Sequence, residues 1–178
     1  MIKQLSNKDL GRISPQEFRL TEKIPLVVVL DGIRSMHNVG SVFRTCDAFC
    51  VERLVLCGIT PTPPHREIQK TALGATETVL WEYEADITEI IKRFKAEGRI
   101  VYALEQTNQS ILLNEMTINP DEKAVLILGN EVFGVSQEVL DLVDAAIEIR
   151  MTGSKHSLNV SVAAGIGIYK FFEATIGL

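Results

Sequence analysis

Apolar runs alternate with helical patterns along most of the chain. The run PLVVVL at positions 25–30 is continuous and rich in β-branched residues, which is typical of a strand buried on both faces. Further apolar runs predict strands at 53–58, 78–83, 99–104, 124–128 and, more briefly, 146–150. Because helical patterns separate these strands, the chain is predicted to be an α/β domain with a mostly parallel sheet flanked by helices.

The helical segments carry start and stop signals. Apolar residues at helical spacing follow Asn38 directly, so we expect Asn38 to cap a helix. An amphipathic pattern that begins at Ile87 ends at Gly98, and Ser136 is expected to begin a shorter helix. The last helix, near positions 157–171, opens with small polar residues and is then apolar nearly all round, which predicts that it is buried.

Polar loops follow three of the predicted strands, at 31–44, 129–136 and 150–159. Ligands of parallel sheets bind beyond the carboxyl ends of the strands, so these loops define the candidate site. Gly129 and Gly134 bracket a tight turn in which backbone amides can meet a ligand without a Cβ in the way. This turn lacks the Lys-Ser/Thr pair of a phosphate loop, and no GxGxxG motif follows the first strand. The loops therefore favour a cationic or zwitterionic ligand, such as S-adenosylmethionine.

Composition narrows the class of protein. The 178 residues, 46% of them hydrophobic, fit one domain with a sizeable core. No apolar run approaches the roughly 20 residues of a membrane span, and positions 1–20 lack the apolar region of a signal peptide, so we expect a cytoplasmic protein. Cys46, Cys50 and Cys57 lack CxxC spacing. Cys46 and Cys50 could share a helical face as metal ligands, but small buried side chains are the favoured interpretation, and we expect no metal.

Charge is unevenly distributed. The net charge of −5 argues against a broad basic surface that coats nucleic acid. Positions 131–148 hold five carboxylates and no basic residue, whereas basic side chains gather in loops after strands: Arg34, His37, Arg44, Arg66, Lys70, Lys155 and His156. Either a segregated positive site on an acidic body or scattered solvated charges would give this pattern.

Three motifs together resemble one known family. They are NVGSVFR at 38–44, LGNEVFG at 128–134 and SLNVSVAA at 157–164. In this order, each after a strand, they resemble the SpoU (TrmH-like) RNA ribose methyltransferases of the SPOUT superfamily. The resemblance makes 25–178 a SPOUT methyltransferase domain and leaves 1–24 as an N-terminal extension. It implies a C-terminal deep trefoil knot, a homodimer, S-adenosylmethionine held by the knotted loops, and methyl transfer to a ribose 2′-hydroxyl of RNA.

The resemblance also implies roles for individual residues. The implied donor-binding residues are Leu104, Gly129, Ile149, Leu158 and Asn159, and the implied catalytic and supporting residues are Arg44, Asn38, Glu131, Ser157 and Asn159. Taken singly, Asn38 and Ser157 could be helix caps, and Gly40 and Gly153 could be turn residues. The family proposal makes Arg44 the general base, but a guanidinium stays protonated in proteins. We therefore expect Arg44 to fix a phosphate and the nascent 2′-oxyanion.

RNA recognition is expected to use the domain itself and the short extension. The basic residues that could bind phosphates there are Lys3, Lys8, Arg12, Arg19, Lys23, Arg66 and Lys70. We expect tRNA rather than rRNA as the substrate. Two alternatives stay open: a catalytically silent knotted protein that binds RNA or the cofactor, and a small-molecule methyltransferase on the same scaffold. The combined presence of Arg44, Asn38 and Asn159 argues against the first, and the basic residues argue against the second.

Overall fold

The computed structural model describes residues 2–6, 9, 11 and 13–177. Two of the expected RNA-binding residues, Lys8 and Arg12, lie outside the described residues. The strands are β1 (Ile24–Asp31), β2 (Val51–Cys57), β3 (Trp81–Glu84), β4 (Ile100–Leu104), β5 (Ile111–Leu112), β6 (Ala124–Leu128) and β7 (Ala145–Glu148). They form one sheet in the order β3-β2-β1-β6-β4-β7-β5, and each of its strand pairings is parallel. The predicted α/β class with a mostly parallel sheet is confirmed.

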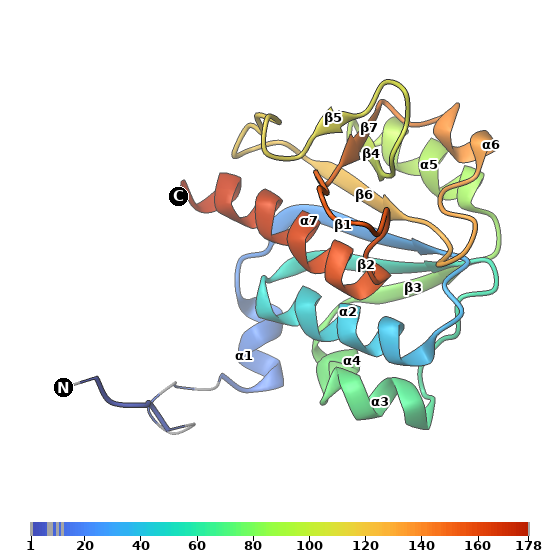
Figure 1. The fold of residues 1–178 in the computed structure, drawn as a ribbon. Helices are drawn as coiled ribbons and strands as arrows, with labels where there is room; N and C mark the ends of the chain where they lie inside the picture. Colours follow the sequence, from blue (N-terminus) through green and yellow to red (C-terminus); the bar gives the residue numbers. More distant parts are fainter. Residues whose placement is uncertain (1, 7–8, 10, 12, 178) are drawn as a thin grey trace.

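Helices cover both faces of the sheet (Figure 1). They are α1 (Pro15–Leu20), α2 (Met36–Ala48), α3 (Arg66–Ala72), α4 (Ala75–Thr78), α5 (Ile87–Ala96), α6 (Gln137–Leu140) and α7 (Val160–Ile176). α2 and α7 lie side by side over one face, and α5 lies on the other. α3 and α4 pack outside α2. The central strands are thereby enclosed between two helical layers.

β1 shows why the sheet needs both layers. Its side chains alternate, so that Val28 and Leu30 join the core beneath α2 and α7, while Val27 and Val29 join the core beneath α5 and α6. These four side chains have no exposed surface. The continuous apolar run at 25–30 therefore encodes a strand buried on both faces, as predicted.

Two predicted boundaries are wrong. α2 begins at Met36 because Ser35, not Asn38, caps it, and the Ser35 hydroxyl accepts the backbone N–H of Asn38 at 3.3 Å. Asn38 therefore lies in the first helical turn with its side chain available for other contacts. β3 begins at Trp81 and not at residue 78, because Thr78 ends α4 and its hydroxyl donates to the carboxylate of Asp47.

Other local signals are confirmed. Ser136 caps α6, and α5 ends just before Gly98, which adopts a positive φ of 75°. Asn159 caps α7, and Ser157 precedes this cap by two residues, so Ser157 is not the helix cap. The alternatives in which Asn38 and Ser157 act only as helix caps are therefore excluded.

α7 buries only part of its apolar surface. Ala164, Ile168 and Phe171 pack into the core, with Ala164 and Ile168 fully buried. A stripe of apolar side chains on the same helix is exposed to 50% at Val162 and 42% at Tyr169. The sequence predicts that the last helix is buried, and within one copy of the chain this prediction is wrong for the exposed stripe.

The segment before β1 is partly folded onto the domain. α1 carries a capping box formed by Ser14 and Glu17, and Phe18 is buried. The Arg19 guanidinium donates to the carbonyl oxygen of Glu77 at 3.0 Å, which links α1 to α4. The ammonium of Lys23 lies 3.5 Å from the centre of the Phe18 ring. Two of the five basic residues expected to bind RNA from the extension therefore have partners within the chain.

Candidate active site

A cavity of about 490 Å³ lies beyond the carboxyl ends of β4, β6 and β7. Its walls are the loops that follow these three strands and the first turn of α7. Six of the predicted site residues line it: Leu104, Gly129, Glu131, Ile149, Ser157 and Leu158. They meet because the carboxyl ends of parallel strands lie at one edge of a sheet.

The segment 129–135, which we call the β6 wall, is a closed turn. Asn130 and Gly134 exchange backbone hydrogen bonds of 3.0 and 2.9 Å. The side-chain oxygen of Asn130 also accepts the backbone N–H groups of Val132 and Phe133, at 2.9 and 3.1 Å. A Cβ added to Gly129 would lie less than 3.0 Å from the backbone of Gly134. Only glycine fits at position 129, which confirms the tight turn predicted there.

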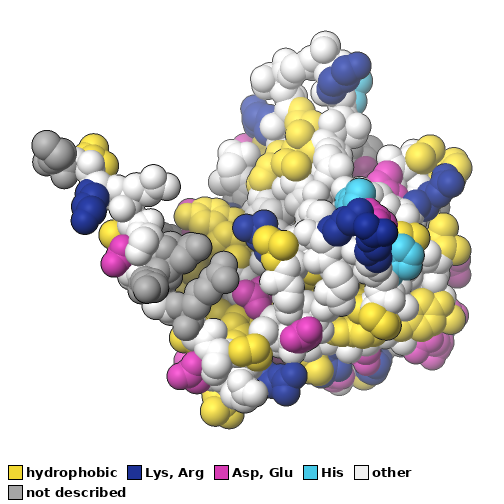
Figure 2. Space-filling view, turned by 90° about the horizontal axis from the view of Figure 1, so that it is seen from below, with side chains coloured by type: hydrophobic (Ala, Val, Ile, Leu, Met, Phe, Trp, Pro, Cys, Tyr) yellow, Lys and Arg dark blue, Asp and Glu magenta, His cyan; other side chains and the backbone are white. Residues whose placement is uncertain are grey.

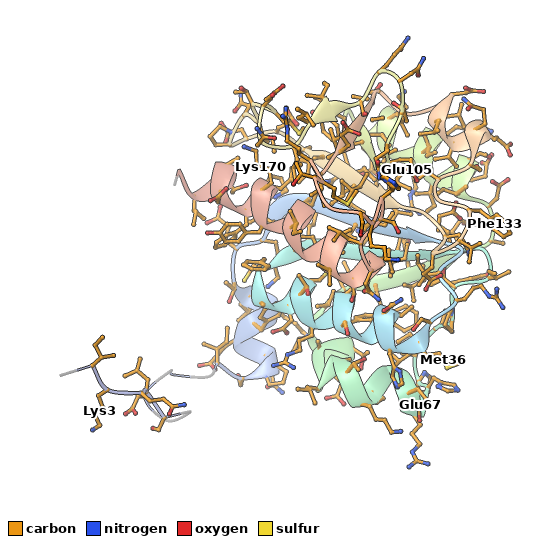
Figure 3. The ribbon with its side chains drawn as sticks, in the orientation of Figure 1. Lys3, Met36, Glu67, Glu105, Phe133 and Lys170 are labelled. Carbon is orange, nitrogen blue, oxygen red and sulfur yellow. The ribbon has the colours of Figure 1, made fainter. Side chains whose placement is uncertain are left out.

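Glu105 fixes the β6 wall from the neighbouring loop. Its carboxylate accepts the backbone N–H groups of Val135 and Gln106, at 2.9 and 2.8 Å. It also lines the cavity (Figure 3). Sequence reasoning missed Glu105, although the same rule that selected the other loops applies, because Glu105 directly follows the strand 100–104.

A hydrogen-bonded chain joins one residue from each of the three motifs. The Asn159 side-chain amide donates to the Asn38 side-chain oxygen at 3.1 Å, and the Asn38 amide donates to the Glu131 carboxylate at 3.1 Å. The same carboxylate accepts the backbone N–H groups of Arg34 and Ser35, at 3.0 and 3.1 Å. Asn38 thus connects the loops after β1, β6 and β7, which a capping role would not require.

These hydrogen bonds determine the charge of Glu131. Partial burial raises the pKa of the carboxyl group, but the backbone N–H groups of Arg34 and Ser35 outweigh this and hold the pKa below its ordinary value of 4.5. A carboxylate with a lowered pKa is a weak proton acceptor at neutral pH. Glu131 is therefore suited to organising the site rather than to removing a proton.

The segment 150–158, which we call the β7 wall, faces the β6 wall across the cavity. Residues 152–158 are all exposed. The Gln106 side-chain amide donates to the backbone oxygen of His156 at 2.6 Å and ties this wall to the loop after β4. The wall ends at Asn159, whose side-chain oxygen accepts the backbone N–H of Ser161 at 2.9 Å.

Asn38, Asn159 and Arg44 are the predicted site residues that do not line the cavity, and of these only Arg44 lies outside the hydrogen-bonded chain. It is exposed on α2, does not line the cavity, and makes no hydrogen bond or ion pair with the described residues. Gly40, between Asn38 and Arg44, is a helical residue and not a turn residue. A Cβ there would lie less than 3.0 Å from the Thr71 hydroxyl and the Ile68 carbonyl oxygen, so Gly40 allows α2 and α3 to approach closely.

The described residues contain no group of three or more His, Cys, Asp or Glu side chains placed to hold a metal ion. Cys46 and Cys57 are buried, and burial raises the pKa of the Cys57 thiol to about 12. Within the same described part of the chain, no helix is both long and apolar enough to cross a membrane.

Comparison with known proteins identifies similar sequences and structures. Residues 25–169 match the model of the SpoU rRNA methylase family. The chain is 32% identical over 145 residues to a tRNA (guanosine(18)-2′-O)-methyltransferase of Thermus thermophilus, covering 82% of this chain and 73% of that protein. It is 31% identical over 152 residues to Staphylococcus aureus proteins assigned to the TrmH family of tRNA/rRNA methyltransferases, which covers 85% of this chain but only 60% of theirs.

Solved structures show the same fold. The TrmH/SpoU tRNA modifying enzyme of A. aeolicus superposes with a TM-score of 0.81 at 28% identity, over 92% of this chain and 83% of that chain. The AdoMet-bound rRNA methyltransferase of Sinorhizobium meliloti superposes with a TM-score of 0.77 at 28% identity, over 90% of this chain and 60% of that one.

Proposed function

The chain belongs to the SpoU rRNA methylase family, and from that premise we propose that it transfers a methyl group from S-adenosylmethionine to a ribose 2′-hydroxyl of RNA. The observation that carries the proposal is the hydrogen-bonded chain Asn159–Asn38–Glu131, of which Glu131 lines the cavity. It joins the three motifs in one place, beside a pocket of the size that small cofactors occupy. The names of the Thermus thermophilus and A. aeolicus proteins support RNA as the substrate.

The cavity fits S-adenosylmethionine chemically. Apolar side chains of Leu104, Ile149 and Leu158 line it and can enclose an adenine ring. The carboxylates of Glu105 and Glu131 also line it and suit a cationic ligand. Gly129 also lines it, and its missing side chain lets the backbone of Gly134 pack against it, which closes the turn that forms the β6 wall. When bound, the cofactor supplies the electrophilic methyl group.

The protein's own residues would act mainly by positioning. In-line transfer requires the 2′-oxygen to be held against the methyl group, and such positioning supplies a large share of a rate enhancement. Asn38, Glu131, Ser157 and Asn159 would shape the place where the ribose meets the cofactor. Arg44 keeps its proton, so we assign it to an RNA phosphate and to the developing 2′-oxyanion, where a fixed positive charge stabilises the transition state.

We propose that residues 25–178 form the SPOUT domain, with a deep trefoil knot at its C-terminal end, and that residues 1–24 are an extension. The knot is supported by the path of the chain around β7. This strand lies between β4 and β5, and the segment after it returns to α7, which packs against α2 (Figure 1). The hydrogen bond between Gln106 and His156 holds this segment against the loop after β4.

A homodimer is proposed on the exposed stripe of α7. Val162 and Tyr169 in this stripe are about half exposed, and obligate interfaces resemble a protein core divided between two subunits. Light scattering at micromolar concentration should report twice the mass of one chain. A monomeric mass at that concentration would contradict the proposal.

The α3 side of the molecule is proposed to bind RNA phosphates, with tRNA favoured over rRNA. Figure 2 views the molecule from that side and shows dark blue and cyan side chains gathered together. The His37 ring and the Lys70 ammonium both contact the Glu67 carboxylate, at 2.8 and 2.7 Å. Arg66 is exposed at the first position of α3. Such a patch supplies the sequence-independent part of RNA affinity.

The test is transfer of labelled methyl from S-adenosylmethionine to bulk tRNA and to rRNA, followed by nuclease mapping of the product. Arg44→Ala should lower the single-turnover rate about 100-fold, because one transition-state contact is lost, and should leave S-adenosylmethionine affinity unchanged. Arg44→Lys should also fail, because lysine lacks the planar fork that holds a phosphate bidentately. Asn159→Ala should weaken cofactor binding. Near wild-type transfer by Arg44→Ala would refute an arginine-dependent ribose methyltransferase.

A further inference from the structure

The tip of the β6 wall presents an aromatic side chain to solvent. Phe133 is 85% exposed and its neighbour Val132 is 70% exposed, although both line the cavity. Figure 3 shows Phe133 at the outer end of the sheet, where the chain turns after β6. Packing within the chain does not explain a phenylalanine here, because most of its ring contacts nothing in the described part of the protein.

The backbone at Phe133 is nevertheless firmly anchored. The backbone N–H of Phe133 donates to the Asn130 side chain at 3.1 Å, and Asn130 also donates to the carbonyl oxygen of Gly32 at 2.6 Å. The turn is closed by the backbone pairing of Asn130 with Gly134. The backbone that carries Phe133 is therefore held in place before any ligand arrives, which limits the conformational entropy lost on binding to the side-chain torsions of the ring.

The loop after β1 lies against the β6 wall close to Phe133. Glu131, two residues earlier, is engaged by the backbone N–H of Arg34 at 3.0 Å, which brings the loop after β1 against the β6 wall. Arg34 itself is exposed and forms no ion pair among the described residues. An exposed aromatic ring on an anchored turn offers a nucleobase a surface to stack on, and an exposed arginine in the loop that contacts this turn offers a phosphate a cation, as in sites that bind single-stranded nucleic acid.

We propose that Phe133 stacks on a nucleobase of the RNA substrate, at or next to the nucleotide whose ribose is methylated. The inference rests on the proposed function, since it places the RNA at the mouth of the cofactor cavity. The adenine of the cofactor is a less suitable partner, because it would lie among Leu104, Leu140 and Ile149 inside the cavity, away from a ring exposed to solvent. Phe133 is thus a substrate-positioning residue, and a target in an unstacked loop of the RNA fits it best.

The variants that test this are Phe133→Ala, Phe133→Leu and Phe133→Tyr, with Leu80→Ala, at an exposed apolar residue that does not line the cavity, as the control. Loss of one stacked base should raise the KM for bulk tRNA roughly tenfold or more in Phe133→Ala. Phe133→Leu should be similarly impaired, whereas Phe133→Tyr should restore most of the affinity. Leu80→Ala should change the KM less than twofold, and all four variants should bind S-adenosylmethionine like the wild type in calorimetry.

A binding assay separates this inference from the proposed function. The sequence has one tryptophan, Trp81, so the extra fluorescence of Phe133→Trp reports on position 133. Addition of bulk tRNA should quench it, and the wild-type signal from Trp81 should stay unchanged. If bulk tRNA quenches the Phe133→Trp fluorescence but the wild-type protein transfers no methyl group, the proposed function is wrong, whereas stacking of an RNA base at position 133 is still supported.

Four results would overturn the inference. They are a normal KM for bulk tRNA in Phe133→Ala, full rescue by leucine, a loss of S-adenosylmethionine affinity equal to the loss of tRNA affinity, and a change of oligomeric mass in Phe133→Ala. The last two would assign the ring to the cofactor or to a second copy of the chain. None of these four results would contradict methyl transfer to RNA by the wild-type protein.

Discussion

The two walls of the cavity differ in how firmly hydrogen bonds within the chain hold them. The β6 wall at 129–135 is fixed by backbone pairing, by the Asn130 side chain and by Glu105 from a neighbouring loop. The β7 wall at 150–158 is exposed along most of its length, and its clearest anchor is the hydrogen bond from Gln106 to the backbone of His156. One wall is thus organised before a ligand binds, and the other depends on contacts that a ligand can supply.

This difference between the walls is consistent with different roles for their residues. The fixed wall carries Glu131 and Phe133, which we assign to organising the site and to the RNA. The loosely held wall carries Ser157 and Leu158, which we assign to the ribose and the cofactor. Regions with few buried contacts and exposed backbone open at low free energy, so a ligand can order them at little cost to the rest of the fold.

The largest expected effect comes from adding a methyl group at Gly129 of the β6 wall. The same change at Gly153 of the β7 wall is the comparison. Gly129→Ala should destabilise the protein by about 3 kcal/mol or more, because its Cβ would overlap the backbone of Gly134. Gly153→Ala should be nearly neutral, because no atom lies within 4 Å of the added Cβ and the φ of Gly153 is not positive. Urea unfolding measures both. Equal losses in the two variants would remove the distinction between the walls.

Binding of S-adenosylmethionine should slow amide hydrogen exchange more in the β7 wall than in the β6 wall. Amide hydrogen exchange should slow by at least an order of magnitude in residues 150–158 when S-adenosylmethionine is added, because these exposed amides would become covered. Exchange in 129–135 should change much less, because amides such as those of Val132 and Val135 already have partners. The measurement is mass spectrometry of peptic fragments. Slowing confined to the β6 wall would show that the two roles are reversed.

Acidic pH should reduce the contribution of Glu131, in the β6 wall, to the free energy of unfolding. The folded-state pKa of this carboxyl group is lowered, so its stabilising contribution is fully present above its ordinary value of 4.5 and is lost as the pH falls through the folded value. Glu131→Gln should therefore be less stable than the wild type at pH 7. The difference in unfolding free energy should shrink as the pH drops below 4.5. A difference that does not depend on pH would show that the negative charge is not the stabilising feature.

The smallest expected effect concerns the anchor of the loose wall. Gln106→Ala removes one exposed hydrogen bond to the backbone of His156 and should cost less than about 1 kcal/mol of stability. Because the wall should become less ordered, cofactor affinity should fall a few-fold. Gln109→Ala, in the same loop, is the control and should bind the cofactor normally. Calorimetry compares the two.

The sequence predicted the fold better than it predicted the contacts within the site. The run at 25–30 located β1 because a strand buried on both faces must be continuously apolar, and the motif residues met because parallel strands end at one edge. Asn38 was misplaced since Ser35, three residues earlier, caps equally well, and only packing selects between them. Glu105 follows a predicted strand and was within reach of the strand-end rule, but its partner Val135, 30 residues away, and the exposure of Phe133 are features that periodicity does not encode.

The place of β1 in the sheet has a consequence for synthesis on the ribosome. β1 pairs with β2, which follows it closely, but its other edge pairs with β6, so that Leu30 lies beside Leu128. Until residues 124–128 leave the ribosome, this largely apolar strand presents an unpaired edge, which is a template for intermolecular association. A nascent chain stopped before Ala124 is therefore an aggregation-prone fragment and not a smaller folded protein, and chaperone demand should peak just before β6 emerges.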